Sequence, residues 1–453
     1  MTGTRTVADL LEQRLRQLGV ERIYGQPLGG LEHIQVDDVE LAVLLADADG
    51  RLGHHDGSGR LGAARVEDVV LHLSSQPGGR VPLHSVHSAE EMLEALADPP
   101  GVTTPGVTAL HLDLDMGASV SADLMAGPRV EPQPVLTLDS SMATLNVVAV
   151  VGPGVVRSFA VEELSEMARK GGIGILHSWG AKWVERWDSP FHFGTAGLQE
   201  RDFELAGLAE ADVLITSGLD PDESPVDALG SWVVQDVHPR QLAALCHRWP
   251  PSRTPPVRPA LYDSIAAVVV PRYESDRVPL SGPRAALHLS GALPERGVVV
   301  ADPGPAGFWI ARTFPTSHPG SVCVPATGGP GFAAAAAIVC RIEGRPCLAV
   351  ADQVTGTGVD DVSGALLELA ESLGLGVALQ LWGPDGSLPD SAGHVSLLAE
   401  HLKSDVVRID DVPVLTGDID DLVAVAGPVS AWSDLTGGGI DEDPSAQNWN
   451  AFS

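Results

Sequence analysis

Asp352 is the residue of this 453-residue chain whose type and position most directly suggest metal chemistry. It follows an apolar run, 346–351, that predicts a buried strand. Ligands bind beyond the carboxyl ends of strands in open parallel sheets, and Mg²⁺ prefers carboxylate, carbonyl and phosphate oxygens. An Asp that only caps a loop would be placed in the same way, so both interpretations stay open.

Two glycine-rich loops could bring backbone N–H groups close to an anion. Thr327-Gly-Gly-Pro-Gly331 precedes the small-residue run 333–337, where close helix packing is the alternative to anion binding. Gly152-Pro-Gly-Val-Val-Arg157 is similar to the start of a dinucleotide-binding fingerprint, but it lacks the third glycine and contains Pro153. We expect a tight strand-to-helix turn there and keep a nucleotide site as the alternative.

The histidines and cysteines give weaker signals. His54-His-Asp56 and His84-x-x-His87 have the spacing of metal-ligand pairs, but neither has a third ligand of fitting type nearby. We expect these side chains to be solvated. None of the four cysteines belongs to a CxxC pair, and we expect all four to be small buried side chains.

The charge balance excludes several classes of partner. Asp and Glu number 60 against 28 Lys and Arg, a formal net charge of −32. Nucleic acids and anionic membranes would be repelled by such a chain. The sequence has no apolar run of about 18 residues and no apolar leader segment, so we expect a cytoplasmic protein that binds neither nucleic acid nor membrane.

The elements that must position these residues follow an α/β pattern. A capped amphipathic helix is predicted over 6–18, and apolar runs that end in glycine or aspartate loops predict most of the strands. The predicted strands are 22–24, 39–45, 66–73, 107–114, 146–151, 173–176, 212–216, 297–301, 346–351 and 376–381. Pro-rich stretches suggest linkers between three domains. We expect a first domain over 1–118, a linker over 119–140, a central domain over 141–248, a linker over 249–280, a third domain over 281–432 and an acidic tail over 433–453.

From about residue 6 to 425, the order of these features resembles the thiamine-diphosphate-dependent enzymes of the acetolactate synthase and 2-oxoacid decarboxylase type. The residues that carry the resemblance are 6–25, Ser75-Gln-Pro-Gly78, 109–114, 148–157 with 162–164 and 211–212, Asp302-Pro-Gly304 with Trp309, and Gly328-Gly-Pro-Gly331. The resemblance implies an α/β fold of three doubly wound parallel-sheet domains. The first and third domains are shorter than is usual in that family.

The resemblance also implies a cofactor, thiamine diphosphate with Mg²⁺. Its matching cofactor-binding positions are Gly25, Gln26, Gln76, Thr327, Gly328, Gly329, Asp352 and Gln353, with Asp352 as the metal ligand. The family's Gly-Asp-Gly metal motif reads Ala351-Asp352-Gln353 here, and its later Asn-Asn pair reads Gly383-Pro384.

The family's activating Glu stands at the end of a strand, eight residues before an Asp-Gly pair. Counted back from Asp56-Gly57, that position is Ala48, flanked by Asp47 and Asp49, which we name as candidate catalytic residues.

Three hypotheses follow from these departures. The first is a degenerate family member, its usual chemistry lost or altered, that serves as a partner or regulator of a complete homologue. The second is an active decarboxylase or carboligase acting on a 2-oxoacid. The third is a nucleotide-binding enzyme that uses the central domain. A small-molecule ligand and a homo-oligomer are further expectations.

Overall fold

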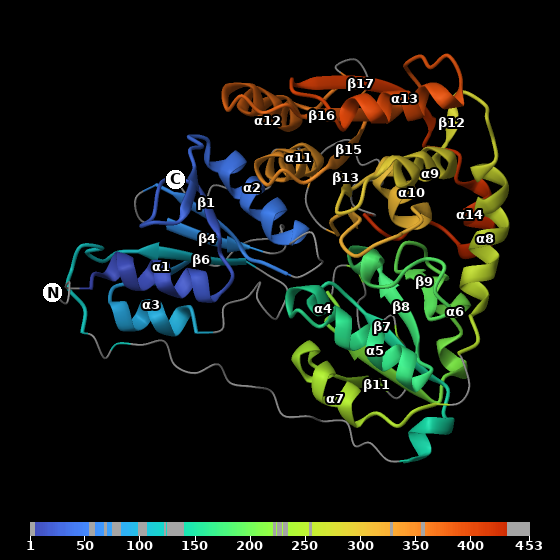
Figure 1. The fold of residues 1–453 in the computed structure, drawn as a ribbon, viewed down its shortest axis with the longest axis horizontal. Helices are drawn as coiled ribbons and strands as arrows, with labels where there is room; N and C mark the ends of the chain where they lie inside the picture. The colour runs from blue at the N-terminus through green and yellow to red at the C-terminus, as the bar shows by residue number, and fades with distance from the viewer. Residues whose placement is uncertain are drawn as a thin grey trace. The chain divides into compact units, whose positions relative to one another are not determined.

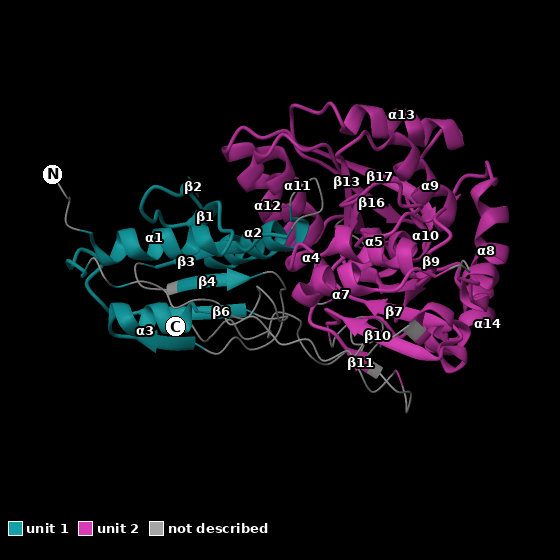
Figure 2. Cartoon of the chain, turned by 60° about the horizontal axis from the view of Figure 1, so that its bottom comes forward, with its two compact units in different colours: residues 1–53, 59–131, 438–453 teal, residues 54–58, 132–437 magenta. Residues whose placement is uncertain are grey.

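The computed structural model describes residues 5–53, 59–67, 70–74, 83–97, 107–121, 124, 140–220, 223, 229, 234–252, 256–326, 329–354 and 358–432. They divide into two compact units: unit 1 lies within residues 5–124 and unit 2 within residues 140–432 (Figure 2). Within these ranges no helix is both long and apolar enough to cross a bilayer. The predicted acidic tail, the His54-His-Asp56 motif and most of the predicted 119–140 linker lie outside the described residues.

Unit 1 contains one six-stranded sheet, with the strand order β2-β1-β3-β4-β6-β5. The sheet is not wholly parallel, because β4 runs antiparallel to both of its neighbours. The elements of unit 1 are α1 (Val7–Gln17), β1 (Arg22–Gly25), β2 (Glu32–Ile34), α2 (Val39–Leu52), β3 (Gly62–Val66), β4 (Val70–Ser74), β5 (Leu83–Val86), α3 (Ala89–Ala95) and β6 (Val107–Leu112).

Helix α1 confirms the helix predicted at the start of the chain. The Thr6 side chain accepts from the Asp9 N–H while the Asp9 carboxylate accepts from the Thr6 N–H, which is a complete capping box. Its apolar face, Val7, Leu10, Leu11 and Leu15, is buried in the core of unit 1.

Two strand predictions in unit 1 are wrong. Residues 39–45 belong to helix α2, where the Asp38 side chain accepts from the N–H groups of Glu40 and Leu41. The helix packs against β1, β3 and β4, so it is apolar on several faces, and periodicity alone does not distinguish such a run from a buried strand. The single strand predicted over 66–73 is instead the antiparallel pair β3 and β4.

The first sheet of unit 2 is parallel, with the order β11-β10-β7-β8-β9. The predicted strands over 146–151, 173–176 and 212–216 are confirmed as β7, β8 and β10. The elements of this part are η1 (Ser140–Thr144), β7 (Val147–Val151), α4 (Gly154–Arg157), α5 (Val161–Gly171), β8 (Gly174–Ser178), η2 (Trp179–Val184), β9 (His192–Ala196), α6 (Asp202–Leu205), η3 (Leu208–Glu210), β10 (Val213–Ser217), β11 (Val234–Asp236), η5 (Pro239–Gln241), α7 (Leu242–Arg248) and α8 (Ala260–Tyr273). Helix α8 occupies residues that the sequence placed in a linker.

The second sheet of unit 2 is also parallel, with the order β12-β17-β16-β15-β13-β14 (Figure 1). The predicted strands over 297–301, 346–351 and 376–381 are confirmed as β13, β15 and β16. The elements are β12 (Leu280–Ser281), α9 (Gly282–Ala292), β13 (Val298–Ala301), α10 (Pro305–Thr313), β14 (Val322–Cys323), α11 (Phe332–Ile342), β15 (Cys347–Asp352), α12 (Asp361–Ser372), β16 (Ala378–Gly383), α13 (Ser391–His401), β17 (Arg408–Leu415) and α14 (Asp420–Ala426).

Buried polar contacts join the part of unit 2 that contains the first sheet to the part that contains the second sheet. The Arg312 guanidinium on α10 donates to the Thr195 carbonyl (2.9 Å) and to both oxygens of the Asp202 carboxylate (2.8 Å each). The Gln199 amide donates to the carbonyls of Leu422 (3.1 Å) and Gly427 (2.7 Å). The two parallel sheets of unit 2, with helices between their strands, confirm the predicted α/β class.

Candidate functional site

Two aspartates meet at the carboxyl edge of the second sheet of unit 2. Strand β13 leads directly into Asp302, and the adjacent parallel strand β15 ends at Asp352. Helix α10 begins just after Asp302, and α11 begins after the Gly329-Pro-Gly331 turn. This is the edge at which open parallel sheets bind ligands.

Asp302 serves as a cap for helix α11. Its carboxylate accepts from the N–H groups of Gly331 (3.2 Å) and Ala333 (2.7 Å). Burial raises the pKa of Asp302 to about 7, and the negative charges of Asp360 and Asp352 act in the same direction. The two helix N–H groups that would attract an external anion therefore already have an internal acceptor.

Asp352 has the same relation to helix α10. Its Oδ1 accepts from the Ala306 N–H at 2.8 Å, and burial raises its pKa to about 7. Gly304, at φ +145°, lets the chain pass this carboxylate, since a Cβ on Gly304 would lie 2.2 Å from Asp352 Oδ2. The loop is thus built closely around the Asp352 carboxylate.

Gln353 is held by the chain's own groups. Its Nε2 donates to Asp411 Oδ1 (2.8 Å), and its Oε1 accepts from the Asp385 N–H (3.2 Å). A Cβ on Gly383 would lie 2.4 Å from Gln353 Oε1, so the Gln353 side chain fills the space that a larger residue at the end of β16 would need. The Gln353 amide therefore links the ends of β15 and β16 to the middle of β17.

The described residues do not fit a magnesium diphosphate. No three His, Cys, Asp or Glu side chains of the described ranges gather into a metal-ligand set. Gly383 offers no side-chain oxygen, the Gln353 amide is engaged, and the loop 326–332 contains no Lys or Arg. Thr327 and Gly328, expected to hold the cofactor, lie outside the described residues, and Gly329 borders open space.

The predicted cofactor residues of unit 1 have backbone roles. Gly25, at φ +94°, brings β1 close to β3, because a Cβ there would lie 2.4 Å from the Arg65 carbonyl oxygen. The Gln26 N–H donates to that same oxygen at 2.9 Å. Gln76 lies outside the described residues.

Asp47 and Asp49 lie on helix α2 and not at a strand end, which corrects their expected setting. Both side chains are buried. Asp47 Oδ1 is 3.2 Å from His72 Nε2 on β4. Asp49 accepts from the Tyr24 hydroxyl (3.0 Å) and pairs with Arg60. Both carboxylates therefore have structural partners inside unit 1.

Glu40 is an acidic residue that the sequence analysis missed. It is exposed in the first turn of α2. Asp49-Gly50 is a second Asp-Gly pair, and counting eight residues back from Asp49 reaches Leu41, next to Glu40. Counted from this pair, Glu40 lies one residue from the expected position.

The glycines at 152 and 154 serve close backbone packing. The N–H of Gly152 donates to the Ser217 carbonyl (3.0 Å), and the N–H of Gly154 donates to the Gly218 carbonyl (2.8 Å). A Cβ on either glycine would lie within 2.6 Å of Gly218 atoms. The Arg157 guanidinium forms a buried two-fold ion pair with Asp220 (3.0 and 2.6 Å). These contacts match the tight turn that we expected and occupy the donors that a nucleotide phosphate would use.

The remaining metal-ligand candidates are dispersed. His87 Nδ1 lies 3.1 Å from Asp113 on the surface of unit 1, and the His84 side chain is also exposed. All four cysteines are free thiols: Cys246 and Cys340 are buried, and Cys323 and Cys347 are partly buried.

Comparison with known proteins identifies solved structures that have the same fold. No family model matches the sequence, and no curated protein matches it. A solved structure from Mycobacterium smegmatis, assigned as a thiamin diphosphate-dependent enzyme, superposes with a TM-score of 0.58 over 91% of this chain and 100% of its own, at 16% identity. Benzoylformate decarboxylase from Polynucleobacter necessarius gives 0.59 over 91% and 99%, at 13% identity. The fold is that of a thiamin diphosphate-dependent enzyme. At these identities the likeness concerns the fold alone.

Proposed function

We propose that this chain keeps the fold of thiamin diphosphate-dependent enzymes while the usual chemistry has been lost or altered, and that it serves as a partner or regulator of a complete homologue. One observation carries the proposal: Asp352 belongs to no group of three metal-ligating side chains among the described residues. The Gln353 amide is bound to Asp411 and Asp385, and Gly383 at the end of β16 has no side-chain oxygen. Mg²⁺ needs several oxygen ligands in octahedral geometry.

Ligand-induced stabilisation tests the proposal directly. A ligand at 100 times its dissociation constant stabilises the folded state by about 2.7 kcal/mol. In a protein of this size that would raise Tm by about 3 °C. We expect thiamine diphosphate with Mg²⁺ to leave Tm unchanged, and pyruvate and benzoylformate to release no CO₂. A Tm shift of that size together with turnover would overturn the proposal.

The partner role has its own measurement. The chain is mixed with a complete thiamin diphosphate-dependent homologue from the same cell, and sedimentation reports whether the two form a complex. We expect a complex and a change in the turnover of the homologue. Independent sedimentation with unchanged turnover would contradict this role.

Glu40 supports a second candidate, an active decarboxylase or carboligase acting on a 2-oxoacid. Its exposed carboxylate stands one residue from the spacing expected for the activating Glu, and Asp352, Gln353 and a loop carbonyl would then be the metal ligands. Under this candidate Glu40→Gln abolishes turnover. The matched control is Glu90→Gln, in the first turn of α3, which keeps turnover. Equal activity of the two variants would rule this candidate out.

A further inference from the structure

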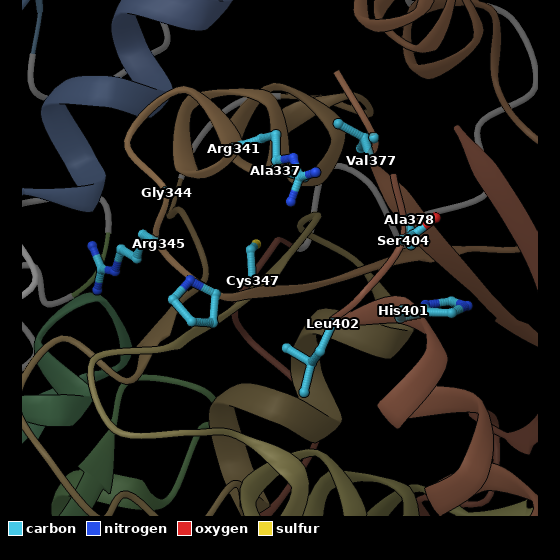
Figure 3. A pocket seen from close by; sticks show the side chains of 12 residues that line it. Ala337, Arg341, Gly344, Arg345, Cys347, Val377, Ala378, His401, Leu402 and Ser404 are labelled. Atoms are coloured by element: carbon cyan, nitrogen blue, oxygen red, sulfur yellow. The ribbon is translucent and has the colours of Figure 1, made fainter. Parts of the chain in front are cut away.

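Unit 2 contains a cavity of about 140 Å³ at the end of the second sheet opposite to Asp352. Strand β15 begins at Cys347 in the cavity wall and ends at Asp352, so the six residues of this strand separate the two places. The lining side chains come from the last part of α11, the starts of β15 and β16, and the end of α13 (Figure 3). The cavity is thus distinct from the candidate site described above.

The charge at this cavity is positive. Arg341, in the last turn of α11, is exposed, and its guanidinium has no hydrogen-bond or ion-pair partner among the described residues. Figure 3 shows its side chain extending from α11 above Cys347. Arg345 is buried in the same wall, and its guanidinium donates to the carbonyls of Gly320 (2.6 Å) and Arg296 (3.3 Å).

Most carbonyl groups at the ends of the two helices beside the cavity are already hydrogen-bonded. At the end of α11, the carbonyls of Val339, Cys340 and Arg341 accept from the N–H groups of the three residues 343–345. At the end of α13, the carbonyls of Leu398, Glu400 and His401 accept from the N–H groups of residues 402–404. These six carbonyls therefore already have N–H partners.

Apart from the two arginines, the titratable side chains of the wall are neutral near pH 7. A hydrogen bond with Cys340, together with burial, raises the pKa of the Cys347 thiol well above its usual value. Burial lowers the pKa of His401, whose Nε2 lies 2.8 Å from Asp410 Oδ2. The carboxylate of Asp410 is in turn paired with Arg408, so it faces its own cation.

The volume limits the class of ligand. A cavity of about 140 Å³ holds only a few water molecules, at about 30 Å³ each, and it is well below the 300–1,000 Å³ of pockets for nucleotides and drug-sized ligands. We propose that this cavity binds a small oxyanion, an inorganic phosphate or a short carboxylate, with Arg341 as the residue that holds it. Arg guanidinium groups bind both anions through paired N–H donors.

Titration calorimetry on the full chain tests the proposal with two probes, phosphate and acetate, each against chloride at matched ionic strength. We expect saturable binding of at least one probe with a dissociation constant near about 1 mM. Binding of only one probe supports the proposal and identifies the source of the anion. No saturable binding of either probe up to about 20 mM would overturn it.

Two variants localise the binding. Arg341→Gln should weaken it at least tenfold. The matched control is Arg277→Gln, an exposed arginine of unit 2 that does not line the cavity, and it should bind like wild type. Equal weakening in both variants would indicate non-specific charge effects and overturn the proposal. Ala337→Leu, which fills the cavity and keeps Arg341, should also abolish binding; retained binding would contradict the site.

Discussion

Lys182 shows how burial changes a single charged residue in unit 2. It is one of only three lysines in the chain, and its Nζ donates to Thr195 Oγ1 at 3.3 Å. Burial and, to a smaller extent, the positive charge of Arg312 together lower its pKa from 10.5 to about 7. Its electrostatic neighbours Arg312, His177 and His192 offer no negative charge, so Lys182 holds its proton weakly.

This pKa predicts a rise in stability with pH. Between pH 7 and 10.5 the unfolded chain keeps the Lys182 proton while the folded chain releases it, so the free energy of unfolding increases with pH in that range. Lys182→Met removes the group, and we expect the variant to be about 1–3 kcal/mol more stable at pH 7 and to lose this part of the slope. Urea unfolding from pH 7 to 10 measures both effects. Lys403→Met, at an exposed site, is the control and should retain the wild-type slope.

Asp202 shows the opposite case, a buried charge with its partner in place. Its carboxylate accepts from the N–H groups of Leu198 (2.9 Å) and Gln199 (3.0 Å) and pairs with Arg312. Asp202→Asn leaves the Arg312 guanidinium buried without its anion, so we expect a loss of about 3–5 kcal/mol in urea unfolding. In the exposed Arg186–Asp188 pair, Asp188→Asn should cost less than about 1 kcal/mol. Similar losses in the two variants would contradict this explanation.

Among the elements, helix α2 determines the organisation of unit 1. It packs across β1, β3 and β4. Its buried Asp47 contacts His72 on β4, and its buried Asp49 contacts Tyr24 on β1. Its contact with β3 depends on Gly62, because a Cβ there would lie 1.7 Å from the Ala46 carbonyl oxygen. The backbone of α2 therefore approaches β3 more closely than any side chain at residue 62 permits.

Gly62→Ala tests this packing. The added methyl group must displace α2 from the sheet, and we expect the variant to lose about 2–4 kcal/mol, with faster amide hydrogen exchange in α2 and β3. Gly364→Ala, inside α12, is the contrasting substitution, because nothing lies within 4 Å of its Cβ. It should stabilise unit 2 by about 0.5–1 kcal/mol. An unchanged exchange pattern in Gly62→Ala would show that the close approach is not required.

For the whole molecule, the net charge of −32 is the dominant long-range property. Many of the exposed carboxylates have no cation close by, since the chain has fewer than half as many Lys and Arg as Asp and Glu. Self-repulsion of this kind opposes the compact state and is screened by salt.

Salt should therefore stabilise the fold. Raising NaCl from about 0.05 to 0.5 M shortens the Debye length severalfold, and we expect Tm to rise by about 3 °C. Calorimetric scans at several NaCl concentrations measure the effect, with equal osmolality of glycerol as the uncharged control. A Tm that falls or stays constant in NaCl would mean that specific ion pairs outweigh the net repulsion.

The sequence by itself determined the features that depend on neighbours along the chain. The capping box at Thr6 and Asp9 placed α1, and the apolar runs before Asp302 and Asp352 predicted two strands. That these strands are neighbours in one sheet is known only from the structure. The order of motifs also predicted the fold of thiamin diphosphate-dependent enzymes, which the solved structures share at 13–16% identity.

Only the tertiary structure decided what those residues contact. Residues 39–45 are helical because they pack across a sheet formed by distant segments, which places Asp47 and Asp49 against His72 and Arg60. Likewise, the Gln353 amide donates to Asp411, which lies 58 residues away in the sequence. This bond engages the side chain next to Asp352, the predicted metal ligand. Such partners are brought together by packing, so no pattern within a few residues of Asp352 could predict them.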